Sequence, residues 1–245
     1  MLFYILSIFS VITLGLSASL YPTLHLITCK RDSANYSACL KHALEDAWPR
    51  FTKGIPEIGF PTLDPLFYKY AKSSIDTGEI HGEAIFTNIS GSGLAEARFS
   101  DIRAHFLDDD VFRLEIDVYV PKLYASGFVK VRGTLSSFVL SGGGYCNVTA
   151  EDVSGPWDLT GHVVNDTWIV ESFRAIPSLQ KLKVQSDDLF DGNKELNNLV
   201  LTFVNEYWPS LYRVLLPIAA KAWDPWFTRI ANTFFSKVSF SELFP

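Results

Sequence analysis

Histidine and cysteine are scarce in this chain, which has five histidines and three cysteines among 245 residues. No two histidines have the H-x-x-H or H-E-x-x-H spacing of a metal site; the five are His25, His42, His81, His105 and His162. The nucleophile elbow G-x-S-x-G is absent, because residues 90–93 read Ser-Gly-Ser-Gly. The three glycines at 142–144 lack the further glycine of a dinucleotide loop. We therefore predict no enzyme activity, no metal site and no cofactor.

A cluster of basic residues is also missing. Lys and Arg number 21 against 27 Asp and Glu, which gives a net charge of −6. An acidic chain without a basic cluster argues against binding to nucleic acids and to anionic membrane surfaces, because both need local positive charge. No linker rich in Pro, Gly or Ser and no low-complexity tract divides the chain. We expect a single domain over residues 20–245, and a monomer.

Charged side chains are absent from residues 1–20, where an apolar run over residues 2–16 is followed by Ser17, Ala18 and Ser19. This layout predicts a secretory signal peptide over residues 1–19. An uncleaved membrane anchor is the alternative, but the run is short for a span of ~20 residues and Ser7, Ser10 and Thr13 interrupt it. No other stretch could span a bilayer. We expect a secreted, extracellular protein with no stable membrane insertion.

Aromatic residues, by contrast, are abundant: the chain has 19 Phe, 10 Tyr and 6 Trp. Such a content fits a well-packed core, and it also fits a core built around an apolar cavity. Composition alone leaves both interpretations open.

The middle of the chain has the period-two pattern of β-strands. Residues 37–50 first predict a helix, which Pro49 should end. From about residue 75 to residue 188, apolar and polar residues alternate in short segments, which predicts an antiparallel meander. Turn signals occur at residues 108–110, 142–144 and 165–166. The predicted strands are 82–88, 104–106, 112–120, 128–132, 134–140, 146–153, 157–164, 168–173 and 179–185.

The last segment has helical spacing over about residues 194–235. Apolar residues recur every three or four positions on two stripes, so the helix should be buried along most of its length. Pro209, Pro217 and Pro225 lie inside it and should bend or break it. The apolar spacing continues across each proline, and no glycine follows Gly192. We therefore predict one bent helix, against the alternative of three separate ones.

Several motifs resemble the insect takeout and haemolymph juvenile-hormone-binding-protein family. They are the pair Cys29 and Cys39, the run Gly-Ile-Pro-Glu-Ile-Gly-Phe-Pro-Thr-Leu-Asp-Pro-Leu at 54–66, Leu-Phe-Asp-Gly-Asn-Lys-Glu-Leu at 189–196, Asn-Glu-Tyr-Trp at 205–208, and the final Leu-Phe-Pro. The resemblance covers nearly the whole mature chain in one order. It implies an α+β fold in which a long, bent C-terminal helix is wrapped by a strongly curved antiparallel sheet, within the wider group of tubular lipid-binding proteins.

The resemblance also implies a disulfide between Cys29 and Cys39, in a loop rich in turn residues. Cys146 is then left over, and its alternation with Val148 and Ala150 predicts a buried free thiol. Cys146 and Val129 stand where the family often has aromatic residues, so the cavity could be wider there; ordinary core variation is the alternative. Four sequons are candidate glycosylation sites, with Asn165 favoured by its turn context: Asn165, Asn147, Asn35 and Asn88.

The function that follows is a secreted carrier of a hydrophobic small molecule, such as a juvenile hormone, a terpenoid or a fatty-acid-like ligand, in an internal tunnel. The alternative is a secreted signalling or interaction protein with a filled core. The apolar stripes of the strands and of the long helix give the expected tunnel lining: Phe112, Leu114, Ile116, Val129, Val131, Phe203, Tyr207, Leu211 and Leu215.

Overall fold

Two very long strands organise the sheet. The structure, a computed structural model, describes residues 26–76, 80–135 and 138–245, so the predicted signal peptide lies outside the described residues. Strand β4 (Val111–Leu135) has 25 residues and β5 (Phe138–Val164) has 27. They pair antiparallel without a register shift, from Val111 opposite His162 to Leu135 opposite Phe138. Strands of about 5–6 residues are typical, so this hairpin forms the spine of the molecule.

The shorter strands flank this spine in two groups. At one end, β2 (Ile80–Ser92) pairs with β4, β1 (Leu66–Asp76) pairs with β2, and β7 (Lys181–Ser186) pairs with β5. At the other end, β3 (Arg98–Phe106) pairs with β4 and β6 (Thr167–Ala175) pairs with β5. We call the first group, with residues 122–135 and 138–151 of the spine, the β2 half. The second group, with residues 111–120 and 153–164, is the β3 half.

The two faces of the spine exchange between these halves. In the β3 half the even-numbered residues of β4, such as Val118 and Val120, are buried in the core. In the β2 half the odd-numbered residues Leu123 and Val129 pack inward instead. The exchange falls where Pro121 and Asp152 interrupt the regular pairing, and Asp152 has a positive φ of 52°. Because of this one irregular pair, the residues of β4 that face inward change from even-numbered to odd-numbered.

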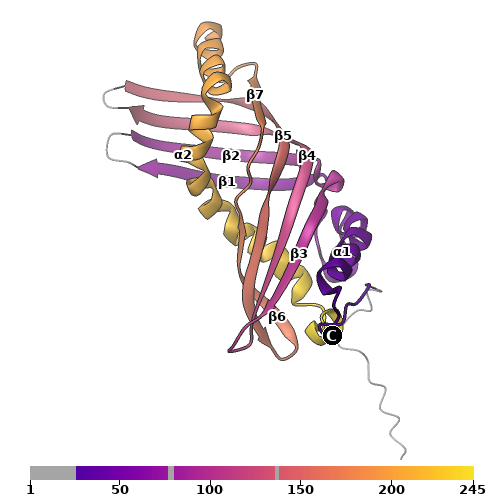
Figure 1. Cartoon of the computed structure of the whole chain (residues 1–245). Helices are drawn as coiled ribbons and strands as arrows, with labels where there is room; N and C mark the ends of the chain where they lie inside the picture. The colour runs from indigo at the N-terminus through magenta and orange to yellow at the C-terminus, as the bar shows by residue number, and fades with distance from the viewer. Residues whose placement is uncertain (1–25, 77–79, 136–137) are drawn as a thin grey trace, which may run out of the picture.

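Helix α2 (Lys194–Phe235) runs through Pro209, Pro217 and Pro225, so the prediction of one long helix is confirmed. It changes direction along its course, crosses the β2 half and then lies along the β3 half (Figure 1). The predicted takeout-like α+β fold is confirmed as a curled antiparallel half-barrel with a long C-terminal helix. The expectation that the helix is buried along most of its length is wrong. Only Asn197, Ala231 and Phe234 are fully buried, because the β2 half covers one side of the helix and leaves the other open.

Polar side chains of α2 complete the free edges of β6 and β7. Asn232 Oδ1 accepts from the Val170 amide at 2.8 Å, and Asn232 Nδ2 donates to the Val170 carbonyl at 2.7 Å. Asn205 makes the same pair of bonds with Val184, at 2.8 Å each. Each asparagine therefore replaces one residue of a missing neighbouring strand and covers an edge that would otherwise be open to pairing.

Several local predictions were wrong. Helix α1 (Tyr36–Lys53) continues through Pro49. The glycines at 142–144 lie within β5 rather than in a turn, because the segment before α2 crosses them: a Cβ on Gly144 would meet the Asp188 carbonyl, and the Gly143 amide donates to the Leu189 carbonyl at 2.7 Å. The predicted strand 134–140 spans the end of β4 and the start of β5. The remaining short elements are η1 (Pro56–Ile58), η2 (Leu94–Glu96) and α3 (Phe240–Leu243).

An aromatic plug closes the far end of the β3 half. Phe112 and Trp168 pack edge to face at 4.7 Å between ring centroids, and Phe240 and Phe244 of the C-terminal segment pack against Phe112. Asp166, in the β5–β6 turn, holds this segment by accepting from Ser239 Oγ. Nearby, the disulfide joins Cys29 and Cys39, whereas Cys146 is free and buried, both as predicted.

Candidate ligand cavity

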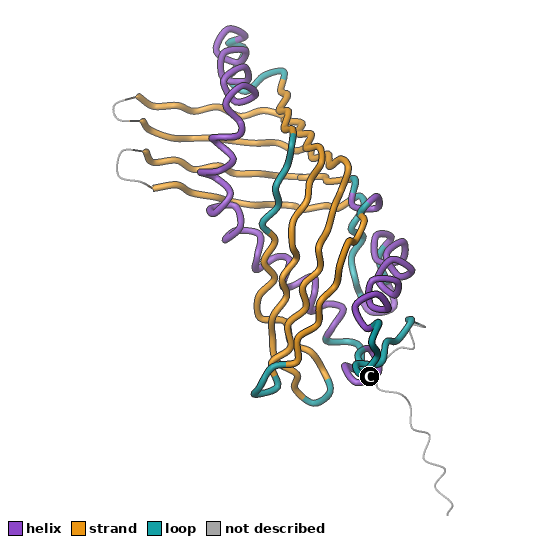
Figure 2. The backbone as a smooth tube through the Cα atoms, viewed as in Figure 1, coloured by secondary structure: helices purple, strands orange, loops and turns teal. Residues whose placement is uncertain are grey.

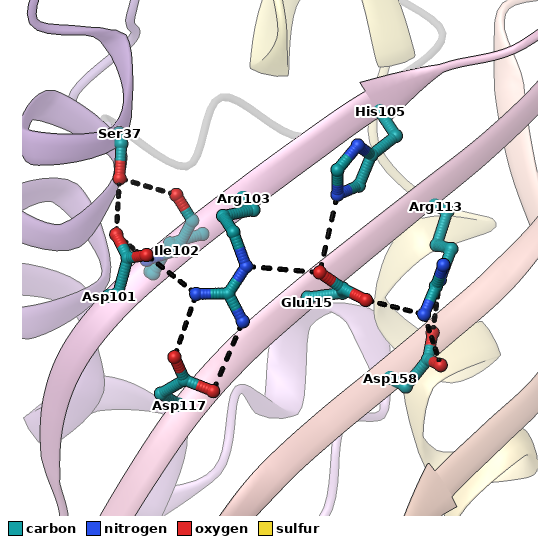
Figure 3. A network of polar contacts seen from close by, with 9 residues as sticks. All are labelled: Ser37, Asp101, Ile102, Arg103, His105, Arg113, Glu115, Asp117 and Asp158. Carbon is teal, nitrogen blue, oxygen red and sulfur yellow. Dashed lines mark hydrogen bonds and ion pairs between the residues drawn. The ribbon is translucent and has the colours of Figure 1, made fainter.

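Strand β4 separates an apolar inner face from a charged outer face in the β3 half. Leu114 and Ile116 point inward and are buried, whereas Arg113, Glu115 and Asp117 alternate with them on the other side. Figure 3 shows that the outward residues join neighbours on β3 and β5 in one polar network. Alternation of this kind is what a strand needs if only one of its faces meets the interior.

The outer network ties α1 to the sheet. Arg103 donates to Asp117 Oδ2 at 2.7 Å and to Glu115 Oε2 at 3.0 Å. Ser37 Oγ of α1 donates to Asp101 at 2.6 Å. The hydrogen bond from Arg103 lowers the pKa of Glu115, and the hydrogen bond from Ser37 lowers the pKa of Asp101. Glu115 and Asp101 are therefore held ionised by their hydrogen bonds, and both pair with Arg103 in a contact that stabilises the sheet.

A cavity of about 420 Å³ lies mainly on the inner side of the β3 half, beneath α1 and the last third of α2, and reaches the near ends of β1 and β2 at Leu66 and Gly91. This volume falls within the range of about 300–1,000 Å³ typical of small-molecule sites. Four of the six tryptophans line it, namely Trp48, Trp157, Trp223 and Trp226. The aromatic abundance of the sequence is thus concentrated around an internal space as well as in the plug. Figure 2 shows the backbone elements around this space, with the strands of the β3 half in orange and the lower part of α2 in purple.

The lining contains no Asp, Glu, Lys, Arg or His among the described residues. Two of the four indole N–H groups in the lining already donate to backbone carbonyls. Trp48 Nε1 donates to the Leu94 carbonyl at 2.8 Å, and Trp223 Nε1 donates to the Ala175 carbonyl at 3.1 Å. Ser154 Oγ lies 3.1 Å from Ser178 Oγ. An ionised group inside this space would therefore lose its hydration without gaining a charged partner, which costs several kcal/mol.

The structure brings together only some of the expected lining residues. Leu114 and Ile116 line the cavity. Phe112 lies in the aromatic plug, and Val129 packs beside Cys146 under the start of α2. The remaining expected residues do not line this cavity. They are Val131 on the inner side of β4 and four residues of α2 that precede Trp223, namely Phe203, Tyr207, Leu211 and Leu215. Val129 and Cys146 also lie outside the lining, so their departure from the family pattern does not widen this space.

Sequence reasoning missed the part of α2 that does close the cavity. Trp226, Phe227, Ile230, Ala231 and Phe234 continue the same apolar stripe toward the C-terminus. The missed residues also include Trp48 and Phe51 of α1. The signal was present as an aromatic density that rises after residue 222, but the stripe alone does not show where along the helix the sheet curls most.

Among the described residues, no group of three or more His, Cys, Asp or Glu side chains is placed to hold a metal ion. None of the helices in the described residues has the length and apolarity needed to cross a membrane.

Comparisons with known proteins agree with the observed architecture. A family model described as haemolymph juvenile hormone binding protein matches residues 5–245. The crystal structure of Takeout 1 from Epiphyas postvittana is similar with a TM-score of 0.67 and 20% sequence identity, over 89% of this chain and 99% of that one. A lipopolysaccharide binding protein gives a TM-score of 0.35 at 16% identity, over 82% of this chain and 39% of that one. None of the curated proteins matches.

Proposed function

Because the chain belongs to the haemolymph juvenile hormone binding protein family, we propose that it carries a hydrophobic small molecule in the cavity of the β3 half. The observation that supports this most directly is an internal space of about 420 Å³ whose lining carries no charged side chain. Apolar surface that enters such a space gains about 25 cal/mol for each Å² removed from water. The alternative of a filled core is disfavoured by the size of the space.

The lining favours an elongated or terpenoid-like ligand that is uncharged where it is enclosed. A juvenile hormone or a similar neutral ester meets this condition. A fatty acid meets it only if its carboxylate remains at the rim, where Ile176 is exposed to solvent. Contacts with Leu114, Ile116 and the aromatic residues of α2 after Trp223 would then supply most of the binding free energy.

We also propose that the chain is secreted, with residues 1–19 removed and one domain over residues 20–245. The family description names haemolymph, and the Cys29–Cys39 disulfide suits an oxidising compartment. All four sequon asparagines, Asn35, Asn88, Asn147 and Asn165, are exposed. Whether Val129, Val131, Phe203, Tyr207, Leu211 and Leu215 touch a ligand stays a prediction, as does the monomeric state.

Filling the cavity tests this function. Ala231 is 6% exposed and faces the cavity from α2. The graded variants Ala231→Leu and Ala231→Trp should lower the affinity for a fluorescent terpenoid or fatty-acid ester in order of side-chain size. Ala231→Trp should bind about tenfold more weakly, which corresponds to about 1.4 kcal/mol and lies within the cost of about 1–3 kcal/mol for overpacking an apolar space.

Val214→Trp is the matched control, because Val214 lies on the same helix, is 69% exposed and belongs neither to the cavity lining nor to the predicted lining residues. Circular dichroism should show that all three variants keep the native fold. Equal affinity of Ala231→Trp and the unsubstituted protein, with both folded, would remove this cavity from consideration.

A further inference from the structure

The outer face of the β2 half, opposite α2, carries a set of exposed aromatic side chains. Val129 packs inward against α2 residues, and Tyr68 packs on Trp226 of α2 at 5.3 Å. Their sequence neighbours must therefore point away from α2. Phe128 and Tyr145 meet edge to face there, 5.5 Å apart. The same face holds Phe67, which is 71% exposed, together with Tyr70 and Tyr124.

Basic residues gather on this face from strands that are distant in sequence. The register places six cations there: Lys72, Lys122, Lys130, Arg132, Lys181 and Lys183. The described carboxylates on the face are Asp76, Glu83 and Glu151. Glu83 is in an ion pair with Lys72 and Glu151 with Lys122 and Lys181, whereas Asp76 Oδ1 lies 3.0 Å from His81 Nδ1, a contact that is an ion pair only when that histidine is protonated. Among the described residues, Lys130, Arg132 and Lys183 have no carboxylate partner. The face is thus locally positive in a chain of net charge −6.

A shallow polar depression lies between the aromatic and the basic residues. Its volume is about 210 Å³, and its lining includes the hydroxyl groups of Ser90, Ser126 and Thr149 and the amide of Asn147. The cross-strand partners Ser90, Ser126 and Asn147 form one row of this face. Such groups can hydrogen-bond the oxygens of a polar head group that neighbouring cations attract.

The outer face of the β3 half has the opposite character. There Asp101, Glu115, Asp117 and Asp158 surround Arg103 and Arg113. The molecule therefore presents one end of its outer surface as cationic and aromatic, and the other as mainly acidic. Aromatic rings with nearby Lys and Arg are the pattern that suits a lipid–water interface with anionic lipids.

We propose that the outer face of the β2 half, defined by Phe67, Tyr70, Tyr124, Phe128, Tyr145 and the six cations, docks onto an anionic lipid surface. The rings would sit among the lipid head groups, the cations would face lipid phosphates and carboxylates, and the depression would accept one head group. The acidic β3 half would point away from the surface. Docking of this kind is peripheral and does not depend on ligand in the cavity.

Vesicle binding tests the proposal with two independent pairs of residues. The intact protein should co-sediment with phosphatidylcholine vesicles that contain phosphatidylserine, should not co-sediment with pure phosphatidylcholine, and should be released by high salt. Lys130→Glu with Arg132→Glu should weaken binding at least about tenfold, since each cation near such a surface contributes about 1 kcal/mol. Phe67→Ser with Tyr145→Ser should also weaken it.

The matched control is Lys53→Glu with Arg229→Glu, which makes the same change in net charge at exposed positions on α1 and α2. This control should bind as the unsubstituted protein does. Loss of binding in the control to the same extent would show that only net charge matters, and would overturn the assignment to this face. Equal binding to neutral vesicles, or no binding to either kind, would overturn it too.

Glycosylation supplies a third test. A glycan on Asn147 would fill the depression and hold the face away from a bilayer. Peptide mapping of protein secreted by a eukaryotic host should therefore find Asn147 unmodified, whatever the state of Asn165. A glycan at high occupancy on Asn147 would contradict the proposal.

Discussion

The bond pair between Asn232 and Val170 offers a sharp test of how α2 is held to the sheet. Val170 is 2% exposed, so its amide and carbonyl are shielded from water where they bond to the asparagine. Asn232→Ala deletes two hydrogen bonds, each with a net contribution of about 1 kcal/mol, and leaves two buried backbone groups unpaired. We expect a loss of about 2–4 kcal/mol in the free energy of unfolding.

Two further variants separate the hydrogen bonds from the general effect of a substitution. Asn232→Asp keeps an acceptor for the Val170 amide but places a carboxylate against the Val170 carbonyl, so at neutral pH it should cost at least as much as Asn232→Ala. Below the pKa of that carboxyl group the new proton can donate to the carbonyl, and part of the stability should return. Thr233→Ala, at the next position, is the control: Thr233 is half-buried and its hydroxyl donates only to the Arg229 carbonyl of the same helix, so its loss should change stability by far less than Asn232→Ala does.

Urea unfolding followed by tryptophan fluorescence measures these differences, and hydrogen exchange of the Val170 amide reports the bond itself. Exchange should be much faster in Asn232→Ala than in Thr233→Ala. If Asn232→Ala and Thr233→Ala have the same unfolding midpoint and slope, the asparagine does not hold the edge of β6.

Two other predictions concern the segment before α2 and the C-terminal plug. Gly144→Ala should destabilise the fold by about 1–3 kcal/mol because its Cβ meets the Asp188 carbonyl, whereas Gly143→Ala, whose Cβ has 3.4 Å to its nearest neighbour, should be tolerated; equal melting temperatures would contradict the close crossing. Burial raises the pKa of Asp166, but hydrogen bonds from Ser239 and Ser241 outweigh it and leave the pKa lowered. Its contribution to stability is therefore full above about pH 4 and is lost as pH falls through the lowered value. Ser239→Ala should weaken this dependence in acid-unfolding curves, and an unchanged curve would argue against the Asp166 contact.

The long helix could be predicted from sequence because its signal is local. The apolar spacing runs unbroken across Pro209, Pro217 and Pro225, and this outweighs the lost backbone donors when a sheet packs beside the helix. Helix α1 likewise continues through Pro49, although the sequence rules alone placed the end of this helix near that proline. The glycines at 142–144 were wrongly predicted as a turn for a different reason. They allow the segment before α2 to pass close to β5, and this tertiary contact is not visible in the local sequence.

The cavity and the cationic face depended on information that a single sequence does not hold. Leu114 and Ile116 could be found because alternation marks an inward face, but the exchange of faces at Pro121 and Asp152 is not visible in the pattern. The basic residues looked dispersed because Lys72, Lys130 and Lys183 are far apart along the chain. Only the register of five paired strands, β1, β2, β4, β5 and β7, gathers them, so the absence of a basic cluster in the sequence did not imply its absence on the surface.

The β4–β5 hairpin also limits how the length of this chain can vary. In each strand, the set of alternate residues that faces inward in the β3 half faces outward in the β2 half. The exchange takes place at the single pair Pro121 and Asp152. An inserted or deleted residue within either strand would shift the register and turn every side chain beyond it to the wrong face. Length changes should therefore survive at the turns around residues 108–110 and 165–166, and selection should remove them within residues 111–135 and 138–164.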